Sequence, residues 1–196
     1  RGLRQRAAAP PGQAHLLAPT AFSELGSPYG GKAAPDGQRL AIFSSAHPRA
    51  WAGRTLPEPR FGLNRLMLFD AALDTCLGVC DGVGHTIHDA AFHPTLPWLA
   101  VATGNSDGGY FFGGRTLLWN WETGERRSLF ASSRFAVRCR FDDAHRLTVL
   151  FTQETDEDDE GHFCTTVQDV LHRSERGPIE LAPWACEPDT LGFGQL

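Results

Sequence analysis

Short apolar runs separated by turn-forming residues fill the stretch from His85 to Phe130. Four such runs are Ala90–Phe92, Leu99–Ala102, Leu117–Trp121 and Ser128–Phe130, each bounded by Gly, Pro, Asn, Asp or Thr. Runs of this length predict β-strands, because the bounding residue types form turns. Consecutive strands joined by short turns predict a four-stranded antiparallel meander. A single meander cannot bury enough surface alone, which predicts neighbours of the same kind.

The second of these runs occurs three times in the chain. The three copies are Arg39–Phe43, Trp98–Ala102 and Arg146–Leu150. Leu99 lies 59 residues after Leu40 and 48 residues before Leu147, and Trp119 likewise lies 48 residues before Val167. A period near 48 with four strands in each unit is typical of β-propeller blades. Helical repeats of that length would instead show a periodicity of about 3.6 residues.

The middle unit resembles a WD-repeat blade in three places. It has Gly84-His85 at its head, Ser106-Asp107-Gly108 in a turn, and Trp119-Asn120 near its end. Blades of that family carry a Gly-His pair, a turn with Asp and Gly, and a Trp-Asp pair. The sequence departs from the family at this last pair, because the middle unit has Asn120 and the outer units have Phe69-Asp70 and Gln168-Asp169.

The resemblance implies an all-β, β-propeller-like chain of three four-stranded antiparallel blades. We expect these blades over residues 32–82, 83–131 and 132–182. Residues 1–31 then form a lead-in or a partial blade, and residues 183–196 a tail or the start of another blade. Because propellers typically have about 4–8 blades, we expect further blades of a longer chain, or a second chain, to complete a larger ring.

Composition narrows the class of partner. The chain has 196 residues, with 41% hydrophobic residues, 21 Gly and 13 Pro, as in a turn-rich all-β domain. A formal net charge of −5 argues against nucleic-acid binding. The sequence has no run of about 18 apolar residues, so we expect no membrane span. The 5 Cys at irregular spacing predict reduced thiols in a cytoplasmic protein.

The longest insertion falls between the second and third strand of each unit: Ser44–Arg65, Thr103–Thr116 and Thr152–Phe163. Loops at one place in every blade emerge on one face of a propeller, and such insertions often mark the binding face. The first two carry aromatic and Arg side chains, which are enriched where proteins bind. We therefore expect a protein or peptide partner there, although these aromatics could also fold back as satellite cores. The candidate partner-binding residues are Trp51, Arg54, Arg60, Phe61, Tyr110, Phe111, Phe112 and Arg115.

The densest set of candidate metal ligands lies at the head of the middle unit. These residues are His85, His88, Asp89 and His93. A zinc site needs converging ligands, but neighbours on a strand such as His88 and Asp89 point to opposite faces. The WD-repeat resemblance instead implies a structural hydrogen-bond network. Its residues would be His85, Thr103, Asp107 and Trp119.

Other site signatures are weak. The acidic stretch 154–160 lacks the spacing of a helix–loop–helix calcium loop, and like-charge runs are usually solvated. No phosphate-binding loop or nucleophile motif occurs, so we expect no cofactor and no catalysis. The sequence thus predicts a protein-interaction scaffold. Two alternatives stay open: a propeller hydrolase with a metal in its central channel, using residues such as His88 or Asp89, and a spacer domain of a larger protein.

Overall fold

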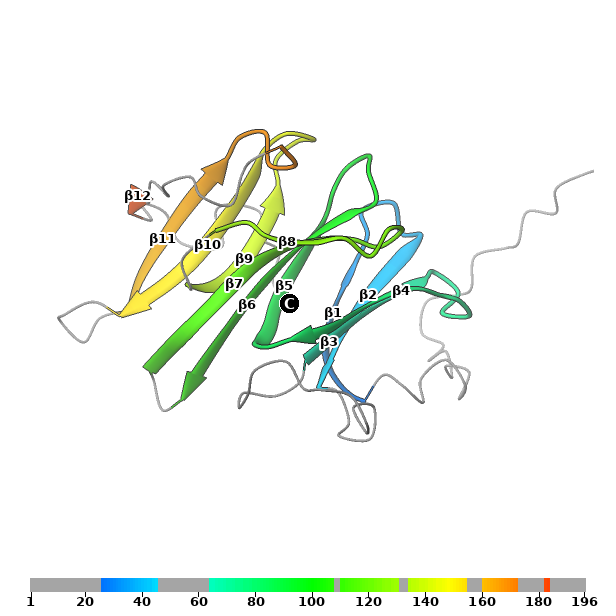
Figure 1. Ribbon diagram of the computed structural model, residues 1–196, viewed down its shortest axis with the longest axis horizontal. Coiled ribbons are helices and arrows are strands. Elements are labelled where there is room, and N and C mark those ends of the chain that lie inside the picture. The colour runs from blue at the N-terminus through cyan, green and yellow to red at the C-terminus, as the bar shows by residue number, and fades with distance from the viewer. Residues whose placement is uncertain are drawn as a thin grey trace, which may run out of the picture.

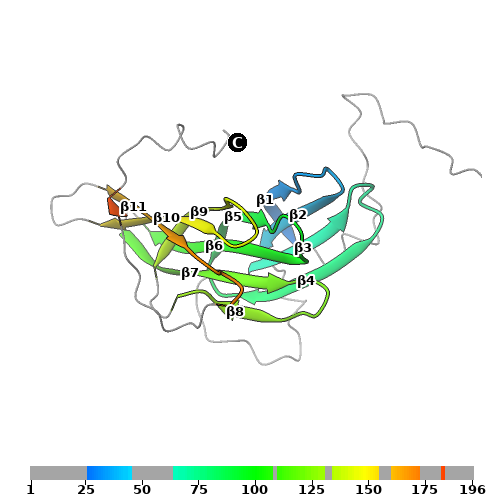
Figure 2. The same ribbon diagram turned by 90° about the horizontal axis from the view of Figure 1, so that it is seen from above.

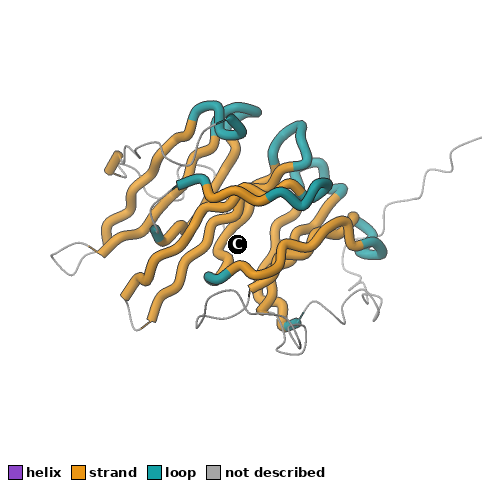
Figure 3. The backbone as a smooth tube through the Cα atoms, in the orientation of Figure 1, coloured by secondary structure: helices purple, strands orange, loops and turns teal. Residues whose placement is uncertain are grey.

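The computed structural model describes residues 26–45, 64–107, 110–130, 134–154, 160–172 and 182–183. Within these ranges the chain consists of β-strands and the turns between them, with no helix (Figure 3). Accordingly, this part of the chain contains no helix with the length and apolar character that a membrane crossing requires.

Twelve strands form three four-stranded sheets, and neighbouring strands in each sheet run antiparallel in sequence order. The first sheet contains β1 (Ser27–Ala33), β2 (Arg39–Ser45), β3 (Asn64–Asp70) and β4 (Cys76–Val83). The second contains β5 (Thr86–Phe92), β6 (Trp98–Asp107), β7 (Tyr110–Asn120) and β8 (Arg126–Ser128). The third contains β9 (Phe135–Phe141), β10 (Leu147–Glu154), β11 (Glu160–Val167) and β12 (Ala182–Pro183). These sheets confirm the prediction of an all-β chain with three antiparallel units.

The three copies of the repeated run occupy like places in the three sheets. Leu40 on β2 pairs with Phe69, Leu99 on β6 pairs with Trp119, and Leu147 on β10 pairs with Val167. This register confirms that the repeat is structural. It also makes Val167-Gln168, rather than Gln168-Asp169, the third-unit counterpart of Trp119-Asn120.

Two expectations about boundaries differ from the structure. Strand β1 begins in the stretch 1–31, expected as a lead-in or a partial blade, and ends at Ala33; its sequence SPYGGKA has no apolar alternation and most of its residues are exposed. An edge strand tolerates Pro and Gly because one side of its backbone needs no ladder partner. The segments Thr103–Thr116 and Thr152–Phe163, expected as loops, are mostly continuations of the β6–β7 and β10–β11 hairpins.

Side-chain oxygens close the turns between the third and fourth strands. Asp70 Oδ1 accepts hydrogen bonds from the backbone N–H groups of Asp74 and Thr75, at 3.0 and 3.2 Å. Asn120 Oδ1 accepts two such bonds, from Glu122 and Thr123, each at 3.0 Å. The turn therefore needs an acceptor oxygen rather than a negative charge, so Asn120 serves the second sheet as Asp70 serves the first.

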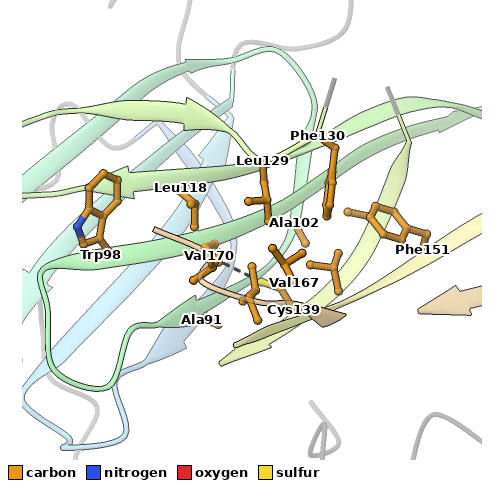
Figure 4. Packing of buried hydrophobic residues seen from close by; sticks show 14 residues of the cluster. Ala91, Trp98, Ala102, Leu118, Leu129, Phe130, Cys139, Phe151, Val167 and Val170 are labelled. Atoms are coloured by element: carbon orange, nitrogen blue, oxygen red, sulfur yellow. Dashed lines mark hydrogen bonds between the residues drawn. The ribbon is translucent and has the colours of Figure 1, made fainter. Parts of the chain in front are cut away.

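The second sheet lies between the other two (Figures 1 and 2). Successive residues on a strand point to opposite faces, so Trp119 packs toward the first sheet and Leu118 toward the third. We call these two contacts the first junction and the second junction. The buried cluster of the first junction includes Phe43, Leu66, Leu68, Leu99, Val101 and Trp119. That of the second includes Ala91, Ala102, Leu118, Cys139, Phe151 and Val167 (Figure 4).

Candidate functional site

The β6–β7 hairpin continues beyond the sheet that contains it. Strands β6 and β7 stay paired out to Asp107 and Tyr110, whereas β5 pairs with β6 only as far as Gly104 and β8 pairs with β7 only at Leu117–Trp119. Residues 105–107 and 110–112 therefore form a two-stranded ribbon that no third described strand joins. We call it the first ribbon.

The β10–β11 hairpin forms a second ribbon in the same way. Gln153 pairs with Gly161 and Glu154 with Glu160, while β9 reaches only Thr152. The two-residue strand β12 pairs with β11 at Phe163 and Cys164, short of the hairpin end. Both ribbons extend on the same side of the molecule, at the lower left of Figure 1, which we call the hairpin side.

Glycines set the direction of the first ribbon. The pairing shifts register between Gly104 and Asn105, and the extra residue on β7 is Gly113, at φ 39. Such a bulge bends a hairpin, and glycine adopts positive φ without a steric penalty. Glycine is needed at Gly104 for space as well, because a Cβ there would lie 2.6 Å from the Cγ of Phe135. The ribbon thus leaves the sheet at a fixed, crowded point.

Four of the candidate partner-binding residues, Trp51, Arg54, Arg60 and Phe61, lie outside the described residues. The structure places the backbone of Tyr110, Phe111 and Phe112 on the first ribbon and does not describe their side chains. Arg115 lies at the base of that ribbon with an exposed side chain.

A buried hydroxyl fixes the backbone of Arg115. Thr103 Oγ1 donates to the Arg115 carbonyl at 2.8 Å and accepts from the Arg115 N–H at 3.0 Å. Because both ends of this contact belong to the β6–β7 pair, Thr103 secures the hairpin where the ribbon begins.

The structure describes the side chains of three residues of the implied blade network, His85, Thr103 and Trp119. Thr103 uses its hydroxyl on Arg115, as above, and Trp119 is buried in the first junction. His85 is half-buried, and burial together with the nearby Arg115 charge lowers the pKa of its ring. Asp107 ends β6, and its side chain is not described.

Asp89 joins the first strands of all three sheets. Its Oδ1 lies 3.0 Å from Lys32 Nζ on β1, and its Oδ2 accepts the backbone N–H of Cys139 on β9 at 3.1 Å. A buried carboxylate needs such partners, because water no longer solvates it. The sequence marked Asp89 as a metal-ligand candidate. An acidic residue followed by the apolar run Ala90–Phe92 is expected to be buried, and this was the signal that it needs a charged or hydrogen-bonding partner.

Tyr29 makes a similar bridge from the first sheet. Its hydroxyl donates to Asn64 Oδ1 at 3.1 Å and accepts the Ile87 N–H at 3.0 Å, and burial raises its pKa. Sequence analysis missed Tyr29, because it lies in the stretch expected as lead-in.

The candidate metal ligands are held apart by separate contacts. His88 Nε2 lies 3.1 Å from the Gly104 carbonyl and its ring packs on Phe135, while His93 contacts the third sheet instead. Loss of solvent lowers the pKa of His88. The side chains that the structure describes include no group of three or more His, Cys, Asp or Glu placed to hold a metal ion.

Comparison with known proteins assigns no family. No family model matches the chain, and no curated protein matches it. Among solved structures the chain is similar to the Pyrococcus horikoshii acylaminoacyl peptidase (orthorhombic crystal form), with 9% identity and a TM-score of 0.47 over 84% of this chain and 26% of that one. The chain therefore spans about a quarter of the length of that peptidase. At this identity and TM-score, the likeness assigns neither family nor activity.

Proposed function

We propose that the chain is part of a WD-repeat-like β-propeller that serves as a non-catalytic scaffold in the cytoplasm. In this arrangement the partner, a protein or a peptide, binds on the hairpin side. The observation that carries the proposal is the pair of ribbons that extend from two different sheets toward the same side. A ribbon outside the packed core contributes little to its own sheet, and it offers backbone groups and side chains to a partner.

The stacked repeats support the propeller part of the proposal. The first strands of the three sheets meet through Lys32, Asp89 and Cys139, as inner strands of successive blades would. On the second sheet, Val101 and Trp119 pack against the preceding sheet, the first one. Ile42 and Phe69 occupy the same places on the first sheet. A further blade on that face would continue the ring.

The test is a peptide-display selection against the full chain, followed by affinity measurements. In the ribbon variant, Ser106–Phe111 is replaced by a two-residue Asn-Gly turn, which suits a short hairpin. In the matched control, Glu122 and Thr123, exposed in the turn at the opposite end of β7, are replaced by Ala. Peptides selected on the wild type should bind the ribbon variant at least about tenfold more weakly, a loss of about 1.4 kcal/mol, and bind the control unchanged.

A point variant narrows the result to one side chain. Arg115→Glu reverses the exposed charge at the base of the first ribbon and should weaken the same peptides by a smaller factor than the ribbon replacement. Equal binding to wild type and ribbon variant, with both chains folded by circular dichroism, would contradict the hairpin side as the binding face.

A further inference from the structure

The imidazole of His93 makes hydrogen bonds with both ring nitrogens, and the contact of one of them links the second and third sheets. The residue follows β5 and is only 5% exposed. Its Nδ1 accepts the backbone N–H groups of Thr95 and Leu96, at 3.2 and 3.0 Å, within its own turn. Its Nε2 lies 2.9 Å from the carbonyl oxygen of Ala144, in the turn between β9 and β10.

These partners fix the protonation state of the ring. Two N–H donors point at Nδ1, so this nitrogen carries the lone pair. The ring proton must then be on Nε2, which donates it to the Ala144 carbonyl. The ring also meets Phe141 edge to face, with centroids 5.0 Å apart. The contact therefore requires a neutral histidine with its proton on Nε2.

The equivalent positions in the other two sheets carry no imidazole. The residue at this position in each sheet donates its backbone N–H to a carbonyl at the start of the second strand. The three bonds run from Ala34 to Arg39, from His93 to Trp98 and from Asp142 to Arg146. Among these three residues, an imidazole is therefore particular to the second sheet.

The charged groups around the ring do not favour its protonation. In the facing turn, the Asp142 carboxylate is paired with Arg140 and the Asp143 carboxylate with Arg146. His145, which lies 3.9 Å from Asp169, is the other titratable group of that turn, and its charge opposes a charge on His93. Within the turn of His93 itself, Thr95 and Leu96 contribute only backbone amides.

We propose that His93 is a pH-sensitive contact that holds the second junction together when neutral and releases it when protonated. A proton from solvent binds the Nδ1 lone pair. The ring then presents an N–H to the N–H groups of Thr95 and Leu96, which lose their acceptor. The turn from His93 to Trp98 can no longer keep its position against the turn of Ala144.

The direction of the pH dependence follows from burial. Burial lowers the pKa of His93 below its usual 6.5, so the unfolded chain binds this proton before the folded chain does. The stabilisation is thus complete above about pH 6.5 and is lost as the pH falls below that value. Because His85 and His88 are shifted in the same direction, the contribution of His93 has to be isolated by substitution.

The test compares urea unfolding of the full chain, from about pH 8 to pH 5, for wild type, His93→Asn and His145→Gln. In His93→Asn, Oδ1 can accept the Thr95 and Leu96 amides, as Asn120 Oδ1 does in its own turn, and it does not titrate. As the pH falls from about 8 to 5, we expect the free energy of unfolding to decrease more for wild type and His145→Gln than for His93→Asn. The reason is that chains with His93 take up as much as one additional proton when they unfold. Measured relative to the intrinsic exchange rate at each pH, exchange of the Thr95 and Leu96 amides should rise at low pH only in chains with His93.

Two results would overturn the proposal. A constant difference between wild type and His93→Asn at every pH would show that His93 is structural and does not respond to protons. A nuclear magnetic resonance titration of the wild-type ring that gives a pKa at or above 6.5 would also overturn it, because the native contacts would then not oppose protonation. This measurement needs no variant.

Discussion

The two junctions join sheets of one topology by different chemistry. In the first, Trp119 packs against Gly78, whose added Cβ would lie 3.1 Å from the indole, and Arg126 donates to the Asp81 carbonyl. In the second, the rings of Phe130 and Phe151 pack edge to face among smaller side chains, and Arg127 donates to the Leu171 carbonyl at 2.7 Å. Cys139 donates its thiol to the Ala100 carbonyl at 3.5 Å, and His93 donates to that of Ala144.

This difference teaches that a repeat preserves strand order and register rather than the chemistry of its contacts. Each junction has an Arg that donates to a backbone carbonyl of the neighbouring sheet or its turn. The second junction also has the neutral imidazole of His93, a contact that responds to protons. Asp89 belongs to both junctions, because its two oxygens serve one junction each.

The largest expected effect comes from two neighbours on β7 that face opposite junctions. Trp119→Ala should lower the free energy of unfolding by about 3–5 kcal/mol and Leu118→Ala by about 2–5 kcal/mol, because each leaves a cavity in a packed core. Hydrogen exchange measured by mass spectrometry should become faster on β2 and β3 in Trp119→Ala, and on β9 and β10 in Leu118→Ala. An increase on the same strands in both variants would break the distinction between the junctions.

An intermediate effect is expected at the residue that both junctions share. Asp89→Ala leaves the buried N–H of Cys139 without its acceptor, at a cost of about 1–3 kcal/mol. Lys32→Met should cost less than about 1 kcal/mol, because the Lys32 side chain is 44% exposed and its ion pair is screened. A double-mutant cycle by urea unfolding measures the coupling. If Asp89→Ala and Lys32→Met lowered the free energy of unfolding equally, Asp89 would stabilise the first junction alone.

Glycines at the two junctions span an intermediate and a small expected effect. Gly104→Ala crowds the Phe135 ring, with 2.6 Å between the new Cβ and Cγ, and should cost about 1–3 kcal/mol. Gly78→Ala approaches Trp119 only to 3.1 Å and should cost less, under about 1 kcal/mol. Thermal unfolding midpoints check the order. The reverse order would mean that the first junction is the more tightly packed of the two.

The strands that could be predicted are those with apolar runs between turn residues. The runs around Leu40, Leu99 and Leu147 fall on the second strand of each sheet, because a half-buried strand must repeat its apolar positions. Strand β1 could not be predicted, since its backbone pairing with β2 leaves no hydrophobic pattern in SPYGGKA. The ribbons were expected as loops because Gly and polar residues are equally suited to a hairpin outside the core.

The candidate site was only partly accessible from sequence. Position between the second and third strands indicated where the ribbons would lie, and Arg115 is exposed at the base of one of them. The roles of Asp89 and His93 depend on partners 50 and 51 residues away along the chain. No local pattern encodes such contacts, because they exist only once the sheets have stacked.

The turn oxygens of Asp70 and Asn120 have a consequence for how such chains are detected. Both side chains close the same kind of turn with an acceptor oxygen, so either residue type is compatible with this fold. Profiles built on invariant signature letters will pass over repeats of this kind. A search weighted toward any short side chain with an acceptor, at the last residue of the third strand, would recover repeats of this kind.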